Sequence, residues 1–461
     1  MRFPYILFFL FTIVLLSAGC RKEKFTDDPS AKLVFSTDTI HFDTVFVSVG
    51  SATQNFKVSN PLGQPLKISN IRLAGGDNSP FRINIDGRPT SSFTDYEIAT
   101  GDSFYIFVEV TIDPNNQSLP FVVTDSIMFE TNGNTQKVIL DAFGQNAHFF
   151  DNKILGCDTN WVNDGKPYVI YRSAAVPPGC SLTIDKGVKV YSHRGSGLFV
   201  YGTLRVNGTQ DEPVIFRGDR LERKFETEPG QWYGIRFVPG SSGNRIKHAV
   251  ISNAYIGVEV DSLPVTGNSN LIIEKTIIKH MTVAGLYGVN SAIEGKNLLI
   301  HACEQYTFLG SFGGDYKFTH CTFDDSHNKT GRKTASFGLS NFYVDINEKP
   351  HFSDLKTDFR NCIIWGNLEE EIGFGKADEA GFDTTFLYNV VKTKDYKFNN
   401  TNQLNQFPKF KSSSANNYLL DSLSPAINAG LKFSGQFLVT DDLVENPRDD
   451  KPDLGCYEFK P

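Results

Sequence analysis

The 461-residue chain carries a net charge of −7, and 40% of its residues are hydrophobic. Because no dense run of Lys and Arg appears, nucleic acid is not expected as a partner. The length leaves room for two or three domains, each with its own apolar core. No second run of about 18 apolar residues follows the N-terminal one, so we expect no further membrane span.

The first 20 residues have the organisation of an export signal. Met1-Arg2 gives a basic start, and residues 3–16 are almost wholly apolar, about the length of a signal-peptide core. The run ends in Ser17-Ala18-Gly19-Cys20, which resembles the lipobox of bacterial lipoproteins. That resemblance implies loss of residues 1–19, acylation of Cys20 and a polar tether over residues 20–32. The alternative is a plain secretory signal with a chance cysteine.

Short alternating strands separated by turn signals fill residues 33–147. Examples of strands are residues 53–58, 105–110 and 137–140, and Asn60-Pro61 and Asn132-Gly133 are examples of turns. This texture predicts an antiparallel β-sandwich. The order of features, including Phe42-Asp43-Thr44-Val45 and the closing Leu140-Asp141-Ala142-Phe143-Gly144, resembles the Ig-like family first described in abnormal-spindle and hydin proteins. The resemblance implies a spacer or binding module.

Residues 148–400 have a different texture, in which short strands follow one another at close intervals. Residues 176–184, 187–190, 198–206, 213–216 and 230–237 resemble the entry to right-handed parallel β-helix proteins of the pectin-lyase-like class. Five eight-residue segments then align without gaps: 246–253, 273–280, 295–302, 318–325 and 359–366. A repeat of this kind indicates stacked coils. The long last spacing predicts an extra or expanded coil.

The columns of this repeat assign positions within a coil. The fourth and sixth columns are apolar or small, so we place them inside, Cys321 and Cys362 among them. The third column suits a tight bend, because Asn and His tolerate left-handed backbone; it contains His248, Lys275, Asn297, His320 and Asn361. The fifth column should face outward yet is mostly apolar, which a covering loop would explain.

Residues 401–461 resemble the C-terminal cap of many bacterial β-helix proteins. The matching segments are residues 407–410, 418–420, 424–430 and 452–459. One departure is a glycine that the resemblance leads us to expect between Asp442 and Arg448 and that the chain lacks. We therefore expect an altered loop there. The overall prediction is an all-β protein, with an Ig-like β-sandwich followed by a right-handed parallel β-helix with a C-terminal cap.

The seventh column supplies the candidate chemistry. It contains Ser252, Lys279, His301, Asp324 and Trp365, which should stack on the outer surface. Polysaccharide lyases of this fold use a basic residue to abstract a proton beside a carboxylate, so Lys279, His301 and Asp324 are candidate catalytic residues. Trp365 is a candidate for stacking on a sugar. The plainer interpretation is that outward positions are polar anyway and that Trp365 packs structurally.

Cysteines and carboxylates give weaker indications. Cys157 and Cys180 are candidates for a disulfide in an exported chain, and no CxxC pair supports a cysteine-based metal site. Acidic runs such as Asp324-Asp325 and Glu369-Glu370-Glu371 could supply oxygens to Ca²⁺, but solvated loops are the alternative. We therefore expect no cofactor, with Ca²⁺ as an open alternative.

These features predict an envelope lipoprotein whose β-helix binds a glycan or a protein partner. The membrane would be reached through the lipid on Cys20, and Arg21 lacks the Asp that holds some lipoproteins at the inner membrane, which favours the outer one. One alternative is a polysaccharide lyase or glycoside hydrolase, and another is a structural envelope component. A groove that gathers two carboxylates, or a base beside an Arg or Lys, would discriminate between them.

Overall fold

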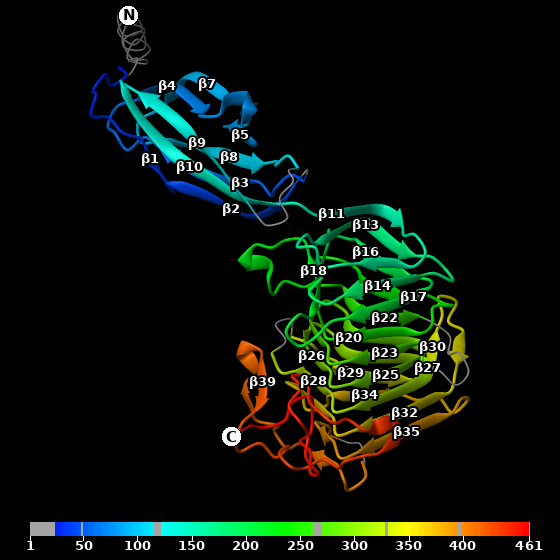
Figure 1. Ribbon diagram of the computed structural model, residues 1–461. Helices are drawn as coiled ribbons and strands as arrows, with labels where there is room; N and C mark the ends of the chain where they lie inside the picture. The colour runs from blue at the N-terminus through cyan, green and yellow to red at the C-terminus, as the bar shows by residue number, and fades with distance from the viewer. Residues whose placement is uncertain are drawn as a thin grey trace, which may run out of the picture. The chain divides into compact units, whose positions relative to one another are not determined.

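A computed structural model describes residues 24–47, 49–114, 121–261, 269–327, 331–394 and 398–460 (Figure 1). The chain divides into two compact units, residues 1–146 and 147–461, within a residue of the expected boundary. Both units are built from strands, and the helices of the described residues are single 3₁₀ turns: η1 (Gly76–Asn78), η2 (Arg223–Phe225), η3 (Ser413–Ala415) and η4 (Gly435–Phe437). The predicted signal and Cys20 lie outside the described residues. None of the described helices has the length and apolarity of a membrane span.

The N-terminal unit is a β-sandwich of two five-stranded sheets. Alternation builds it: along β8, Phe104, Ile106 and Val108 are buried while Tyr105 and Phe107 face solvent. The pairs are antiparallel except β2 with β10, which run parallel. The first sheet contains β1 (Val34–Phe35), β3 (Gln54–Ser59), β8 (Ser103–Val110), β5 (Phe81–Ile85) and β6 (Arg88–Thr90). The second contains β2 (Thr39–Phe46), β10 (Asn134–Gln145), β9 (Phe121–Thr131), β4 (Leu66–Leu73) and β7 (Ser92–Ile98).

The second unit is a parallel β-helix made from one 25-stranded sheet. A strand generally pairs with the one three further along, as β14, β17, β20 and β23 do, so each coil contributes to three faces. The first face contains β16 (Gly197–Val200), β19 (Gly234–Phe237), β22 (Ile256–Asp261), β29 (Phe337–Ser340), β34 (Ile372–Gly375) and the first halves of β25 (Ala284–Lys296) and β27 (Tyr306–Thr319).

The second and third faces complete the coils. The second contains the other halves of β25 and β27 with β12 (Thr159–Trp161), β14 (Ser181–Asp185), β17 (Thr203–Asn207), β20 (Asn244–Lys247), β23 (Leu271–Glu274), β32 (Leu355–Arg360) and β35 (Phe382–Leu387). The third contains β11 (His148–Ile154), β13 (Tyr168–Val176), β15 (Lys189–Ser192), β18 (Val214–Gly218), β21 (Ala249–Ser252), β24 (Ile277–Met281), β26 (Leu299–Cys303), β28 (Thr322–Asp325), β33 (Ile363–Gly366), β36 (Val390–Val391) and β37 (Gln403–Leu404). β13 runs on from the third face into the first.

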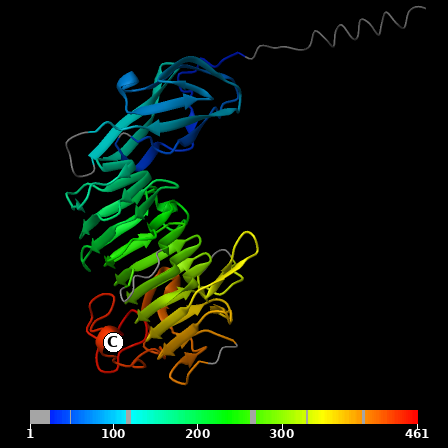
Figure 2. The same cartoon turned by 90° about the vertical axis from the view of Figure 1, so that its right-hand side faces the viewer.

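The predicted columns agree with this register. Residues of the fourth and sixth columns are buried, and Ile251, Ile278 and Phe323 are part of one continuous core. Every residue of the third column has a positive φ, between 47° and 54°, which is the left-handed bend expected between the second and third faces. The long spacing before residue 359 is an expanded coil, into which the hairpin β30 (Phe342–Val344) and β31 (Pro350–Phe352) is inserted. Figure 2 shows this hairpin in yellow, projecting from the stack.

The C-terminal segment folds back over the third face. It begins after β37, four residues beyond the expected boundary, and contains the hairpin β38 (Phe410–Ser412) and β39 (Asn417–Leu420). Leu299 of the fifth column packs with Tyr418, Leu443 and Cys456, and Ile363 packs with Leu454. The cap therefore supplies the cover that the apolar fifth column called for.

Candidate functional site

The three candidate catalytic residues stack in register but do not form a surface site. Lys279 pairs with His301, and His301 with Asp324, on consecutive coils. The cap covers two of them: His301 is 1% exposed and Asp324 is fully buried. Tyr418 Oη donates to Asp324 Oδ2 at 3.1 Å, and its ring lies 4.8 Å from that of His301. The prediction of a surface site is therefore wrong for His301 and Asp324, because Tyr418, 94 residues beyond Asp324 in the chain, covers them, whereas Lys279 stays partly exposed.

Burial explains the electrostatics of this covered cluster. It raises the pKa of Asp324 to about 6 and lowers the pKa of His301 well below its usual value. Asp324 Oδ1 accepts a hydrogen bond from Ser326 Oγ at 2.6 Å, so the carboxyl group is held within the protein. These groups support the packing of the cap and offer no access to a substrate.

Trp365 is also covered, so its ring does not present a face for a sugar. The residue is 6% exposed and packs with Ile363 and Leu420 under the cap. The centroid of the Trp365 ring lies 5.8 Å from that of Phe407. Lys392 Nζ lies 5.0 Å from the centroid of the Trp365 ring. The plainer interpretation, structural packing, describes this residue.

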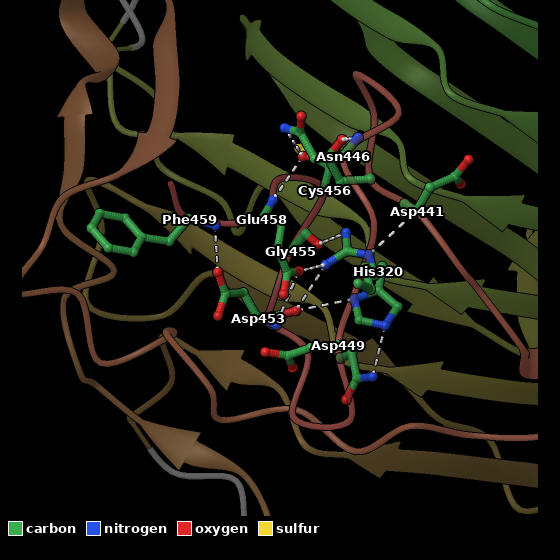
Figure 3. A network of polar contacts seen from close by, with 12 residues as sticks. His320, Asp441, Asn446, Asp449, Asp453, Gly455, Cys456, Glu458 and Phe459 are labelled. Atoms are coloured by element: carbon green, nitrogen blue, oxygen red, sulfur yellow. Dashed lines mark hydrogen bonds and ion pairs between the residues drawn. The ribbon is translucent and has the colours of Figure 1, made fainter. Parts of the chain in front are cut away.

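The bend residues of the third column hold the cap in place (Figure 3). His320 Nδ1 lies 3.1 Å from the backbone oxygen of Asp453, and Asn361 Nδ2 donates to His320 Nε2 at 2.9 Å. Arg448 Nη2 donates to Asn297 Oδ1 at 3.1 Å. We call this set of contacts between the third column and residues 441–458 the clasp. The polar third column thus binds the C-terminal cap by hydrogen bonds, and the apolar fifth column packs against the same cap.

The loop from Asp442 to Arg448 takes up its conformation without the expected glycine. Glu445 adopts a left-handed backbone there, with a φ of 65°. Its carboxylate lies 3.3 Å from Lys275 Nζ and 3.1 Å from His248 Nε2, both in the third column. These contacts compensate for the strain of a non-glycine residue, because they tie the loop to two coils.

Two of the cysteines and two residues of the acidic runs have structural partners. A disulfide joins Cys157 and Cys180, whose Cα atoms lie 4.6 Å apart. Asp325 and Glu371 bind Arg332, at 2.9 and 2.8 Å, in a fully buried ion triad. Across the described ranges, no three His, Cys, Asp or Glu side chains are grouped so that they could hold a metal ion.

A different group of residues, on the first face, has the character of a binding site. Four segments align there, Gly197–Val200, Gly234–Phe237, residues 257–260 and residues 285–288, each beginning with Gly. Gly234 needs its glycine, because its φ is 126° and a Cβ atom would lie 1.7 Å from the backbone oxygen of Ile256. The third position of these segments faces outward and forms a ladder: Phe199, Arg236, Glu259 and Tyr287.

Charged groups at the centre of this ladder are organised around Arg236. Its Nη2 lies 2.6 Å from Asp261 Oδ2, and its Nε lies 3.6 Å from Glu259 Oε1. Tyr233 Oη donates to Glu259 Oε2 at 2.7 Å, and burial, helped by this carboxylate, raises the pKa of Tyr233 to about 12. One cation and two carboxylates give this part of the face a net negative charge. Two carboxylates thus meet at Arg236, on strands outside the five aligned segments.

A cavity of about 420 Å³ lies beside these charges. It is lined by Pro239, Asp261, Tyr287, Val289, Asn290, Ser311, Phe312 and Tyr343. Tyr343 comes from the β30–β31 hairpin and meets Phe312 edge to face, with ring centroids 4.8 Å apart. His351 stacks on the Tyr343 ring at 4.8 Å and lies 3.0 Å from Asp345 Oδ2, so the hairpin holds the aromatic ring at the cavity.

Comparisons with known proteins add little to this geometry. No protein family and no curated protein matches the chain. The chain is similar to the catalytic unit of the GH87 alpha-1,3-glucanase from Streptomyces thermodiastaticus, at 10% identity and a TM-score of 0.20, over 69% of this chain and 78% of that one. It is similar to the Vibrio cholerae protease VesB at 12% identity and a TM-score of 0.18, and to a family 123 glycoside hydrolase from Clostridium perfringens at 9% and 0.19. These two similarities cover 24% and 29% of this chain and 31% of each of those. Similarities at such TM-scores carry no argument about function.

Proposed function

We propose that the β-helix binds a neutral glycan in the cavity of the first face. The observation that carries the proposal is the composition of that cavity: aromatic rings from Tyr287, Phe312 and Tyr343 stand beside the hydrogen-bonding groups of Asp261 and Asn290. Sugar rings present apolar C–H faces together with hydroxyl groups, and this mixture complements both features. The cavity volume falls within the usual range for small-ligand sites.

The charge of the site favours an uncharged ligand. Asp261 lines the cavity, and the neighbouring Arg236 is already bound to Asp261 and Glu259. An anionic polysaccharide would meet net negative charge and no free cation among the lining residues. A lyase needs a group that neutralises the substrate carboxylate, so this geometry supports binding better than elimination.

We also propose that the protein is tethered to the cell envelope through Cys20. The support is the N-terminal sequence, in which an apolar run ends in small residues and a cysteine. The N-terminal β-sandwich, whose sequence resembles an Ig-like family, would then act as a spacer. A protein with this arrangement would hold the β-helix at a membrane surface where glycans are available.

Glycoside hydrolysis is a second candidate, favoured by the two carboxylates of β22. Glu259 and Asp261 are alternate residues of one strand, so their Cα atoms lie roughly 6.6 Å apart and their side chains share a face. Glycoside hydrolases use a pair of carboxyl groups, one as the acid and the other as the base or nucleophile. Against hydrolysis, the Glu259 side chain is 9% exposed and is bound by Tyr233 and Arg236.

Titration calorimetry with neutral oligosaccharides, and with uronic acid oligosaccharides in parallel, tests the binding proposal. We expect Tyr343→Ala to weaken neutral oligosaccharide binding at least tenfold. Tyr201→Ala is the matched control, because Tyr201 is 44% exposed against 43% for Tyr343 and does not line the cavity. Failure of every neutral oligosaccharide to bind, or equal losses in both variants, would refute the proposal. Release of reducing ends that is abolished by Glu259→Gln would establish hydrolysis instead.

A further inference from the structure

The seventh column of the third face continues beyond the cap into a region with a different composition. Ser252 pairs with Lys279, and Lys279 pairs with His301. Phe216 pairs with Ile251, which places Arg217 beside Ser252 on the preceding coil. Because adjacent coils lie about 4.8 Å apart, the backbones of Arg217 and Lys279 are separated by roughly 9.6 Å, with Ser252 between them.

The cationic groups of this column are not neutralised within the described part of the chain. Lys279 is partly buried, and its ammonium group forms no hydrogen bond or ion pair with a described residue, although its backbone oxygen accepts a hydrogen bond from Asn253 N at 3.2 Å. Burial lowers the pKa of Lys279, and Glu226 is the carboxylate that acts on it from a distance. Arg217 Nη2 donates to the backbone oxygen of Arg220 at 3.1 Å, while its Nε is buried without a partner.

Unpartnered nitrogen atoms therefore lie on both sides of Lys279. On one side is Arg217 Nε, and on the other is Nδ1 of His301, which is 1% exposed. Other charges nearby are already paired: Arg220 binds Glu222 at 2.6 Å, and His193 lies 2.7 Å from Asp219. Burying a cation without a partner costs free energy, so such a group is a natural place for an anion.

Ser252 lies between the two cationic residues of the column. It is 5% exposed and pairs with Lys279 on one side, while Arg217 lies beside it on the other. Its backbone oxygen accepts a hydrogen bond from Trp232 Nε1 at 2.8 Å, which fixes this part of the coil. A guanidinium group, a hydroxyl group and an ammonium group on successive coils can donate to one oxyanion from three directions.

We propose that Arg217, Ser252 and Lys279 bind a phosphate or sulfate group, either free or carried as an ester on a larger molecule. The site lies on the third face, whereas the glycan cavity lies on the first, so the two proposals are independent. Asp324 and the covered part of the column take no part in it.

Titration calorimetry and thermal unfolding at constant ionic strength, with inorganic phosphate or sulfate replacing chloride, test this site. Saturable binding is expected for the wild type and for Tyr343→Ala. Lys279→Met and Arg217→Gln should each weaken binding at least tenfold. Lys189→Gln is the control, because Lys189 is an exposed lysine on the same face, and it should bind like the wild type. Glucose 6-phosphate and glucose 6-sulfate then distinguish an esterified ligand from the free ion.

The behaviour of the variants without phosphate separates binding from a structural role. Removing an unpaired cation should leave Lys279→Met at least as stable as the wild type. A wild type that shows no saturable binding, a Lys279→Met variant that still binds, or one that unfolds earlier without phosphate would overturn the proposal. Should both variants fail to fold, acylation of the wild type with and without phosphate, followed by mass spectrometry, measures whether phosphate protects Lys279. The absence of protection would refute the proposal.

Discussion

The buried triad of Arg332, Asp325 and Glu371 allows a sharp test of how the expanded coil is held together. Arg332 Nε lies 2.9 Å from Asp325 Oδ2, and its Nη2 lies 2.8 Å from Glu371 Oε2. The Arg332 side chain is 1% exposed and the two carboxylates are fully buried. Arg332→Met keeps much of the volume and removes the charge, so it leaves two carboxylates without their cation.

The magnitude follows from the environment of the two carboxylates. Removing one partner from a buried ion pair costs about 3–5 kcal/mol, because the remaining charge stays desolvated. Arg332 also donates to Thr334 and Asn367, and hydrogen bonds that involve a charged group are worth about 1.5–3 kcal/mol each. We therefore expect Arg332→Met to lower the free energy of unfolding of the β-helix by about 4 kcal/mol or more at neutral pH.

Urea denaturation followed by tryptophan fluorescence measures this loss. Trp161, Trp232 and Trp365 all lie in the second unit, so the signal reports on the β-helix alone. The loss should shrink as the pH falls, because the stranded carboxylates of the variant take up protons more readily than unfolded ones.

A matched variant isolates the charge effect. Adding Asp325→Asn and Glu371→Gln to Arg332→Met removes the stranded charges and should restore much of the lost stability, since buried ion groups are often replaceable by neutral ones. A loss below about 1 kcal/mol for Arg332→Met alone, unchanged by pH, would refute the reasoning, because the carboxylates would then carry no uncompensated charge.

Three further predictions follow from the clasp, the core and the N-terminus. Burial keeps the pKa of His320 well below its usual value, so below about pH 6.5 the unfolded chain binds a proton that the folded chain does not bind. The free energy of unfolding should therefore decrease by up to about 1.4 kcal/mol per pH unit as the pH falls. His320→Asn should reduce that slope, and a slope equal to that of the wild type would contradict this. The buried thiols should resist thiol reagents until the protein unfolds, and rapid native labelling would show a wrong register; they are Cys303, Cys321, Cys362 and Cys456. Cys20→Ala should abolish acyl labelling and leave an unprocessed or mislocalised protein, and unchanged labelling would rule out lipidation there.

The coils could be predicted from the sequence because neighbouring coils repeat the same local contacts. Each column of the aligned segments repeats one environment, so the inward Ile278 and Phe323 and the bend at Asn297 could be placed from the residue types alone. The hairpin within the expanded coil was not specified, because an insertion breaks the period that the other coils share.

The site was harder to predict, for two physical reasons. The exposure of His301 and Asp324 depends on Tyr418, whose contact with them comes from outside the repeat. The apolar fifth column was the available signal, because alternation should have made it polar. The ladder residues Arg236, Glu259 and Tyr287 lie on strands outside the five aligned segments. Aligning Gly234, Gly257 and Gly285 would have revealed that ladder.

The clasp also limits how the length of this β-helix can change. Stacked repeats usually tolerate the gain or loss of a unit, because each unit contacts its neighbours alone. Here residues 441–458 bind coils from His248 to Asn361 simultaneously, because Glu445 contacts His248, the backbone oxygen of Asp453 contacts His320, and Gly455 N donates to the backbone oxygen of Asn361. Inserting one coil between those two residues would move one end by about 4.8 Å and break contacts of hydrogen-bond length. The C-terminal segment thus fixes the number of coils between His248 and Asn361. Variation in coil number is expected before residue 246, where the clasp makes no contact.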